Sequence, residues 1–181
     1  FCSLAEARDS ETGNHIRRTQ HYVRALALEL RGDPRFADRL DDATVEMLFK
    51  SAPLHDIGKI GIPDSILLKP GRLTPDEFEV MKTHTTLGRD VIMHAEIELG
   101  ARPRFLDMAA EIALSHHEKW DGSGYPQGLK GEEIPLSARL MAVADVYDVL
   151  TSRRVYKAPV PHNQTVATMR AERGRHFDPD I

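Results

Sequence analysis

Apolar residues recur at three- and four-residue spacing along most of the chain, which is the pattern typical of amphipathic helices. The sequence contains no internal repeat and no low-complexity segment. One apolar stripe predicts a long first helix over residues 12–31, ended by Gly32-Asp33-Pro34. The same spacing predicts further helices over residues 42–56, from 74 onward, from 103 onward, over 136–152 and over 164–173.

One helix start is marked unusually clearly. Thr74 is predicted to be an N-cap, Pro75 fits the first helical position, and Glu77 completes a capping box. The helix that follows is predicted to carry five residues on one face: Phe78, Met81, His84, Gly88 and Val91.

Two glycine-rich stretches, residues 57–73 and 120–135, are predicted to be loops. The second has four glycines in ten positions, which predicts several unusual backbone angles rather than a loose linker. Its aromatic residues, Trp120 and Tyr125, could pack on the core or stack on a base.

Several ionisable residues interrupt apolar runs. His55 and Asp56 follow such a run, and Asp145 lies in the middle of another, Leu140 to Val146. A buried carboxylate costs several kcal/mol unless it is paired or bound to a metal. For Asp145 the alternatives are a metal or an arginine such as Arg139. The His55-Asp56 pair, taken alone, could equally be a surface pair at a helix end.

Other histidines lie on predicted apolar faces. His116 and His117 follow directly from a buried stripe, and two adjacent imidazoles there are hard to satisfy with hydrogen bonds alone, which favours metal ligation. Glu11 and His15 stand four residues apart on one helix face and could share a metal or be an exposed pair. His84 could be an ordinary core histidine.

Composition limits the classes of function. The chain has 181 residues, 41% hydrophobic and 29% charged, which suits one compact domain. A net charge of −4 provides no overall basic field for long nucleic acids. The single cysteine, Cys2, excludes an internal disulfide and a cysteine-based zinc site, and fits a reducing cytoplasm. No apolar run approaches the roughly 20 residues that span a bilayer.

Both ends of the sequence are abrupt. Phe1 opens directly onto helix-like sequence, and residues 177–181 read as a helix start without its helix. We therefore expect the chain to be the C-terminal part of a longer protein with a regulatory domain upstream.

The candidate ligands are all histidines or carboxylates, a set that suits divalent iron, manganese, nickel or zinc. They are too many for one tetrahedral zinc but suit two or three octahedral ions. Two ions about 3.5–4 Å apart are a common device for attack of hydroxide on a phosphodiester. The set is Glu11, His15, His55, Asp56, His84, His116, His117 and Asp145.

These residues carry a family resemblance. His55-Asp56 with the spaced His84, His116-His117 and Asp145 resembles the HD phosphohydrolase superfamily. The run from His116 to Pro126, with Gly124-Tyr125-Pro126, resembles its HD-GYP branch. The resemblance covers nearly the whole chain. It implies an all-α helical bundle, with a five-helix HD core plus additional helices, as a single domain over residues 1–181. It also implies phosphodiesterase activity on the bacterial second messenger cyclic di-GMP, giving linear pGpG, with GMP as a further product left open.

The resemblance also implies roles for single residues. Asp56 would bridge two metals and act in catalysis with Lys59, while Glu11 would hold a third metal. Arg154, Tyr156 and Lys157 would contact substrate phosphates, and Tyr125 would border the pocket. Val155 departs from the family, which often has proline there. The other ligands of the set would hold two or three divalent ions.

The resulting hypothesis is a metal-dependent phosphodiesterase in which a metal-bridging hydroxide attacks a cyclic dinucleotide. One rival is a degenerate module that senses cyclic di-GMP or docks a protein through the Gly124-Tyr125-Pro126 loop. Another is an HD enzyme that prefers linear pGpG or a different cyclic dinucleotide. A homodimer and a protein partner at that loop are further expectations.

Overall fold

The computed structural model describes residues 14–99, 104–153 and 158–181. Within these ranges the chain is helical and has no strand, which confirms the all-α helical fold. The helices are α2 (His15–Leu30), α3 (Asp42–Ser51), α4 (Asp64–Leu67), α5 (Pro75–Lys82), α6 (His84–Leu99), α7 (Arg104–Ser115), α8 (Leu136–Thr151) and α9 (His162–Ala171). Short 3-10 helices are η1 (Ala37–Arg39), η2 (Ala52–Leu54), η3 (Ile57–Gly61) and η4 (Gly131–Glu133).

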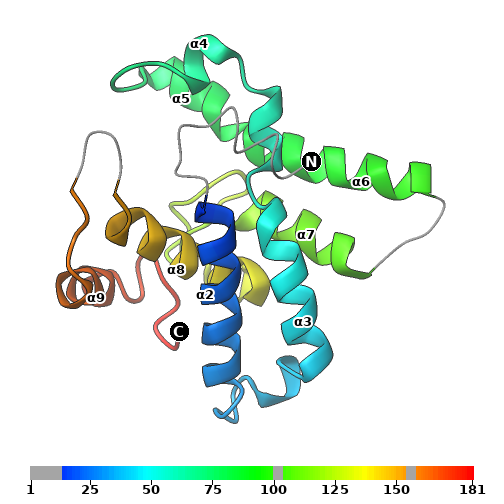
Figure 1. Cartoon of the computed structure of the whole chain (residues 1–181), viewed down its shortest axis with the longest axis vertical. Helices are drawn as coiled ribbons and strands as arrows, with labels where there is room; N and C mark the ends of the chain where they lie inside the picture. Colours follow the sequence, from blue (N-terminus) through cyan, green and yellow to red (C-terminus); the bar gives the residue numbers. More distant parts are fainter. Residues whose placement is uncertain (1–13, 100–103, 154–157) are drawn as a thin grey trace.

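The main core lies among α2, α3, α7 and α8 (Figure 1). Their apolar faces meet because each helix repeats apolar residues at helical spacing, and each fully buried aliphatic side chain contributes roughly 1.5–3 kcal/mol. The fully buried members are Val23, Ala27, Leu40, Leu48, Ala52, Ile112, Leu140, Met141 and Ala144.

A second apolar cluster joins η3, α6 and α7. It includes Ile57, Ile92 and Ala113. Helix α6 packs along α7 on the side away from α8, and α4 and α5 form a separate projection beyond α6 (Figure 1).

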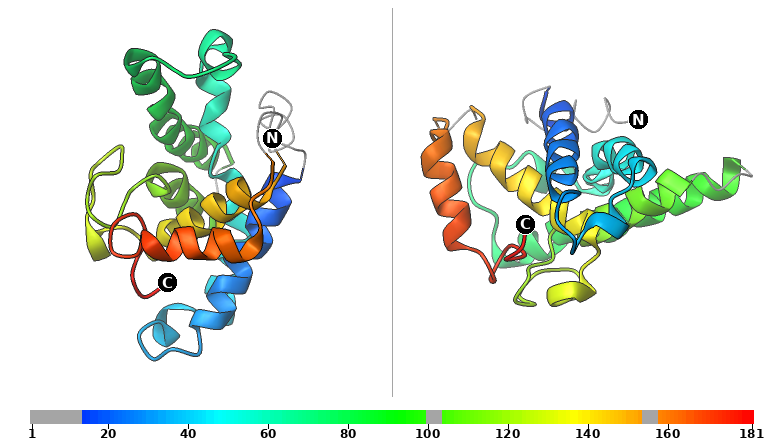
Figure 2. Two further views of the ribbon diagram at one scale, coloured as in Figure 1. Left: turned by 90° about the vertical axis from the view of Figure 1, so that its left-hand side faces the viewer. Right: turned by 90° about the horizontal axis from the view of Figure 1, so that it is seen from below.

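The last helix, α9, packs on α8, and the segment after it returns beside α8 (Figure 2). A buried ion pair fixes this segment, with Arg139 Nη1 donating to Asp178 Oδ2 at 2.6 Å. Within the described part of the chain, no helix is long and apolar enough to cross a bilayer.

Two predicted helix boundaries are wrong. The helix predicted over residues 42–56 ends at Ser51, because the following turn contains Pro53 and becomes 3-10. The His55-Asp56 pair therefore lies in a tight turn between η2 and η3.

The helix predicted from Thr74 to Val91 is interrupted. The capping box of Thr74 and Glu77 is confirmed, but α5 ends at Lys82, and both the amide and the hydroxyl of Thr83 bond to the Val80 carbonyl. Phe78 and Val91 are 43% and 51% exposed, so the predicted single face does not exist. His84 instead begins α6 and is buried.

Candidate metal centre

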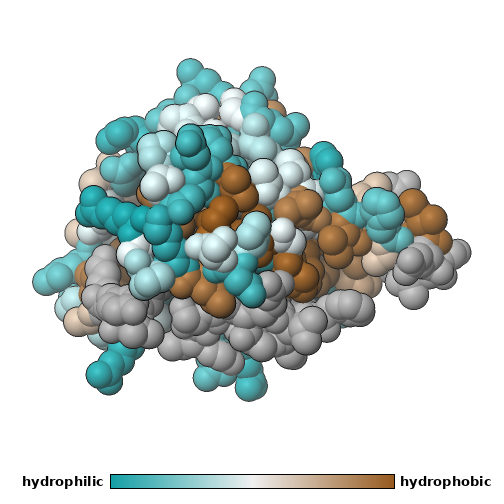
Figure 3. All heavy atoms as spheres, turned by 90° about the horizontal axis from the view of Figure 1, so that it is seen from above, coloured by the Kyte–Doolittle hydropathy of each residue, from teal (hydrophilic) through white to brown (hydrophobic). Residues whose placement is uncertain are grey.

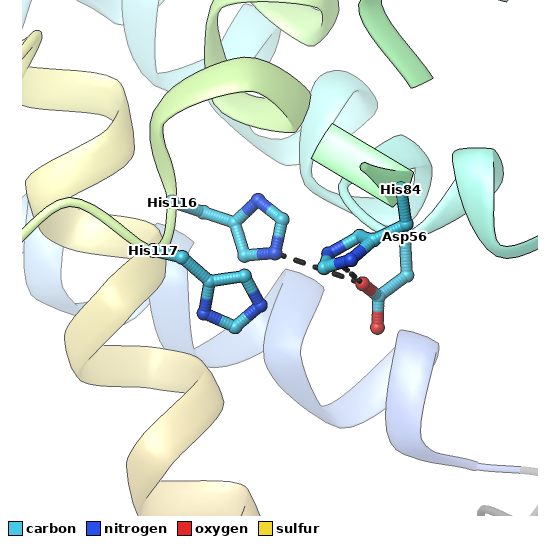
Figure 4. A group of neighbouring side chains, drawn as sticks. All are labelled: Asp56, His84, His116 and His117. Carbon is cyan, nitrogen blue, oxygen red and sulfur yellow. Dashed lines mark ion pairs between the residues drawn. The ribbon is translucent and has the colours of Figure 1, made fainter. Parts of the chain in front are cut away.

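Two groups of ligand-type side chains lie side by side in the interior. Asp56, His84, His116 and His117 form the first group, in which the ligand atoms lie within 4.8 Å of one another (Figure 4). His15, His55 and Asp145 form a second group that meets the same criterion.

Asp56 connects the two groups through its two carboxylate oxygens. Its Oδ1 lies 3.4 Å from His84 Nε2 and 3.6 Å from His116 Nε2, the contacts dashed in Figure 4. Its Oδ2 lies 3.3 Å from His55 Nε2, in the other group. This is the arrangement in which one carboxylate can bridge two cations.

The imidazoles are oriented for ligation. Nδ1 of His55 donates to the Ala52 carbonyl at 2.9 Å, and Nδ1 of His84 donates to the Met81 carbonyl at 2.7 Å. Nδ1 of His116 similarly donates to the Ile112 carbonyl at 3.0 Å. A carbonyl can only accept, so in the neutral ring the proton is on Nδ1 and the lone pair is on Nε2.

Those lone pairs have no hydrogen-bond partner within the protein. Nε2 of His55, His84 and His116 and Oδ1 of Asp56 are all buried and make no hydrogen bond. Each buried polar atom without a hydrogen bond costs about 1–3 kcal/mol, and cations bound in the two groups would provide partners for all four. The donor set therefore fits divalent metal ions.

His15 is held differently, through a carboxylate. Its Nδ1 donates to Asp148 Oδ2 at 2.8 Å, and Arg18 donates to both oxygens of Asp148 at 2.6 and 2.9 Å. Carboxylates that orient a ligating histidine are common in metal sites. Asp148 was not predicted from the sequence, although it lies one helical turn after Asp145 in the same apolar helix.

Charge in the cluster is concentrated at Asp56. Burial raises the pKa of Asp56, but Lys59 and His55 outweigh it and hold that pKa well below the usual value. Burial lowers the pKa of His55, yet the neighbouring Asp56 carboxylate raises it to about 9, so the ring is protonated at pH 7 without a cation and would lose its Nε2 proton when a metal binds. Burial lowers the pKa of His84 to about 4 and holds the pKa of His117 well below its usual value, so both rings are neutral at pH 7.

Two glycines, Gly58 and Gly88, allow Asp56 and His84 to come together. A Cβ at Gly58 would lie 1.9 Å from the His84 carbonyl oxygen and 2.4 Å from the Gly88 amide nitrogen. Only glycine permits η3 to approach α6 this closely, and the approach brings Asp56 to His84. Of the other ligand-type residues, His15 begins α2, His116 and His117 directly follow α7, and Asp145 lies in the second half of α8.

The loop after His117 is held by another buried carboxylate. Glu118 is 2% exposed and accepts hydrogen bonds from the Gln127 amide at 2.7 Å and the Leu129 amide at 3.0 Å. A Cβ at Gly124 would lie 2.3 Å from the Lys119 nitrogen, so this turn also requires glycine. Glu118 was likewise not predicted; a carboxylate directly after two buried histidines was the available signal.

The structure resolves alternatives that the sequence left open. Arg139 pairs with Asp178, whereas Asp145 Oδ1 lies 3.5 Å from His15 Nε2, so Arg139 is not the partner of Asp145. Trp120 packs under the Arg139 guanidinium, 5.7 Å from the ring centroid.

The remaining predicted site residues fall into two classes. Tyr125 stacks on His117, with ring centroids 4.8 Å apart, and Lys59 Nζ lies 2.8 Å from Asp56 Oδ2. Four predicted site residues lie outside the described residues: Glu11, Arg154, Tyr156 and Lys157.

Comparison with known proteins agrees with this geometry. Residues 3–181 match the HD domain family. The chain is 59% identical, over its full length, to a probable cyclic di-GMP phosphodiesterase from Vibrio cholerae, of which it covers 41%. It is 45% identical over 98% of its length to a cyclic di-GMP phosphodiesterase from Thermotoga maritima, of which it covers 45%. The chain thus spans less than half the length of these relatives.

Solved structures show the same fold. A cyclic GMP-AMP specific phosphodiesterase from V. cholerae aligns with a TM-score of 0.66 at 22% identity, over 98% of this chain and 44% of that one. An HDG"Y"P protein from Bdellovibrio bacteriovorus aligns with a TM-score of 0.62 at 21% identity, over 96% and 54% of the two chains. The chain belongs to the HD domain family, which confirms the resemblance that its motifs indicated.

Proposed function

We propose that this domain is a metal-dependent phosphodiesterase of the HD-GYP type, which hydrolyses cyclic di-GMP to linear pGpG. The observation that carries the proposal is the position of Asp56. One of its oxygens faces His84 and His116 while the other faces His55, and the facing nitrogens are buried without hydrogen bonds.

The ligands of one ion would be Asp56, His84, His116 and His117, and those of the other His15, His55, Asp56 and Asp145. Bound divalent ions would lower the pKa of a water and neutralise charge developing on the phosphoryl oxygens. Whether a third ion is held with Glu11 and which metal is used, among iron, manganese, nickel and zinc, are questions for elemental analysis.

The chain's own residues supply the rest of the chemistry. Asp56 and the histidines fix the ligand geometry, and the Nδ1 hydrogen bonds of His15, His55, His84 and His116 keep these four imidazoles in the ligating tautomer. Lys59 places a positive charge beside Asp56, at the edge where a phosphate diester would approach, and would stabilise charge on the phosphoryl oxygens. Tyr125 borders the same site, and we propose that Arg154, Tyr156 and Lys157 hold the substrate phosphates.

The substrate is inferred from the relatives. Proteins 59%, 57% and 45% identical to this chain bear the name cyclic di-GMP phosphodiesterase, with one of them termed probable. A second candidate is 3'3'-cGAMP, because a V. cholerae relative named as specific for it is 42% identical over the whole chain. A sensor that has lost catalysis is disfavoured, since the predicted ligands among the described residues all belong to the two groups that could hold a metal ion.

We propose further that this domain is regulated by another segment of a longer protein, since the matched part forms only 41% of the first V. cholerae relative. A cytoplasmic location is proposed as well. Homodimerisation and a protein partner at the Gly124-Tyr125-Pro126 loop stay predictions.

The test combines metal analysis with product chromatography. The purified protein should contain about two or more divalent ions per chain and convert cyclic di-GMP to pGpG, with pGpG and 3'3'-cGAMP run in parallel. Asp56→Ala should lose both metal and turnover while keeping its helix content. Asp38→Ala, at an exposed carboxylate in η1, should change neither. Full turnover in Asp56→Ala would refute the mechanism.

A further inference from the structure

An exposed aromatic residue stands at the edge of the metal centre. Phe78, on α5, is 43% exposed, and its ring centroid lies 6.1 Å from that of Tyr125 at an interplanar angle of 82°. Tyr125 in turn stacks on His117, with centroids 4.8 Å apart and planes 28° apart. Three rings therefore form a row that begins at a predicted metal ligand and ends in solvent.

Packing in the hydrophobic core does not account for the position of the Phe78 ring. Helix α5 has no buried residue, so Phe78 is not there to hold α5 against the bundle. Seen from above, the space-filling view shows apolar surface interleaved with polar side chains on this side of the molecule (Figure 3). Ligand-binding sites commonly combine aromatic side chains with a few convergent polar groups, as Phe78 and Tyr125 do beside the Asp56 cluster.

A lysine holds the outer two rings together. Lys82 Nζ lies 5.1 Å from the Phe78 ring centroid and 5.6 Å from the Tyr125 ring centroid, within the range of cation–π contact with both. Lys82 also donates to Glu79 at 2.6 Å, one turn earlier on α5. The rings are thus fixed relative to each other before any ligand arrives, which lowers the entropy cost of binding a flat molecule.

We infer that Phe78, supported by Lys82 and Tyr125, is a nucleobase-stacking residue of this enzyme. One purine of the dinucleotide would stack on the exposed Phe78 face while a phosphodiester reaches the Asp56 cluster. The inference rests on the proposed function and deepens it by naming what holds the base. None of the predicted site residues lies on α5.

The chemistry of stacking sets the expected specificity. Every base presents a π face, so stacking on an aromatic side chain tolerates changes of base, and it typically strengthens binding by about tenfold or more. Phe78 should therefore add affinity for cyclic di-GMP and 3'3'-cGAMP alike, and discrimination between guanine and adenine must come from hydrogen-bonding groups elsewhere.

The experiment compares substrates with and without a base, using metal-loaded protein. For Phe78→Ala we expect KM for cyclic di-GMP to rise about tenfold with kcat changed less than twofold, and the same for 3'3'-cGAMP. Hydrolysis of methyl 2,2,2-trifluoroethyl phosphate, a small diester without a nucleobase or any other aromatic ring, should stay within twofold of the wild-type rate. Phe78→Trp should keep the wild-type KM, whereas Phe78→Leu, which is apolar but has no π face, should behave as Phe78→Ala.

Controls separate stacking from general damage. Val80→Ala removes a 39% exposed apolar side chain from the same helix and should leave all constants unchanged. Metal content should equal that of the wild type in every variant. A wild-type KM in both Phe78→Ala and Phe78→Leu would overturn the inference, as would an equal loss on the base-free diester.

Calorimetric binding of cyclic di-GMP provides a readout that does not depend on turnover. If the wild type binds the dinucleotide without cleaving it, the proposed function fails, yet a tenfold weaker Kd for Phe78→Ala would still support the stacking role. If the wild type cleaves it and Phe78→Ala binds it equally well, the proposed function stands and the stacking role fails.

Discussion

His15 and Asp148 are joined by a hydrogen bond of 2.8 Å that links the start of α2 to the last turns of α8. Both residues are buried, and Arg18 completes the arrangement by pairing with Asp148. The carboxylate thus fixes the orientation of an imidazole whose other nitrogen faces Asp145. Removing such a supporting carboxylate typically lowers metal affinity 10- to 100-fold, by a general estimate for such sites.

Asp148→Asn should accordingly weaken metal binding by about 10- to 100-fold while the fold persists. The amide keeps the size of the side chain but carries no charge to balance Arg18. Competition with a chromogenic chelator would measure the affinity. Asp38→Asn, on the surface, is the matched control, and wild-type affinity in Asp148→Asn would show that the hydrogen bond does not support the site.

Gly58→Ala should destabilise the fold by about 1–3 kcal/mol and reduce metal content, because the new methyl would overlap backbone atoms of His84 and Gly88. Backbone atoms cannot move aside as a flexible side chain can. Urea unfolding and elemental analysis would measure both effects. Gly32→Ala, whose Cβ would meet only the Glu29 carbonyl at 3.5 Å, should unfold at nearly the wild-type urea concentration.

Glu118→Gln should loosen the loop that carries Tyr125. The amide can accept at one atom only, so one of the Gln127 and Leu129 amides would lose its acceptor, at a cost of about 1–3 kcal/mol. Hydrogen exchange at these two amides should accelerate, while metal content stays near wild type. Unchanged exchange protection would mean that the loop is held by its other contacts.

Removal of metal should lower thermal stability. Without cations, Nε2 of His55, His84 and His116 is buried and makes no hydrogen bond. An ion that binds only the folded state and is present at a hundred times its Kd adds about 2.7 kcal/mol to the free energy of unfolding. Treatment with a chelator should lower Tm by several degrees, and stoichiometric metal should restore it. An identical Tm for the apo and loaded protein would contradict a folding-linked site.

The start of α5 should respond to acid. Hydrogen bonds from Lys69 and the Thr74 amide lower the pKa of Glu77 below its usual value, so the unfolded chain takes up this proton at higher pH than the folded one. The stabilisation by Glu77 is therefore complete above the usual carboxyl pKa and declines as the pH falls through the lowered folded-state pKa. The Thr74 amide shift in an NMR titration would report this, and Glu77→Gln should abolish the transition.

The sequence predicted most helices and the residues that cluster in the two ligand-type groups, because both predictions depend on how a residue differs from its neighbours in the sequence. Asp145 in an apolar run and His116-His117 after a buried stripe are anomalous wherever the chain goes, so a partner could be inferred without knowing the fold. The capping box at Thr74 is similarly local, and the structure has it as predicted.

What could not be predicted depends on contacts between distant segments. Asp148 and Glu118 look like ordinary acidic residues until the fold brings Asp148 to His15, and Glu118 to the Gln127 amide. The break at Thr83 is another case, since helical periodicity runs straight through it. For the same reason Phe78 was placed on one face of a continuous helix together with His84, although Phe78 is exposed and His84 is buried.

The position of Asp145 late in the chain has a consequence for biosynthesis. The first group of ligand-type side chains, which contains Asp56, lies entirely before α8, whereas the second group joins His15 to Asp145 on α8. A nascent chain that still lacks α8 therefore has only the first group complete. If both groups hold ions, as proposed, full metal loading has to wait until α8 has left the ribosome. A fragment ending before α8 should take up fewer ions, which would make stoichiometric metal content a direct assay of completed folding.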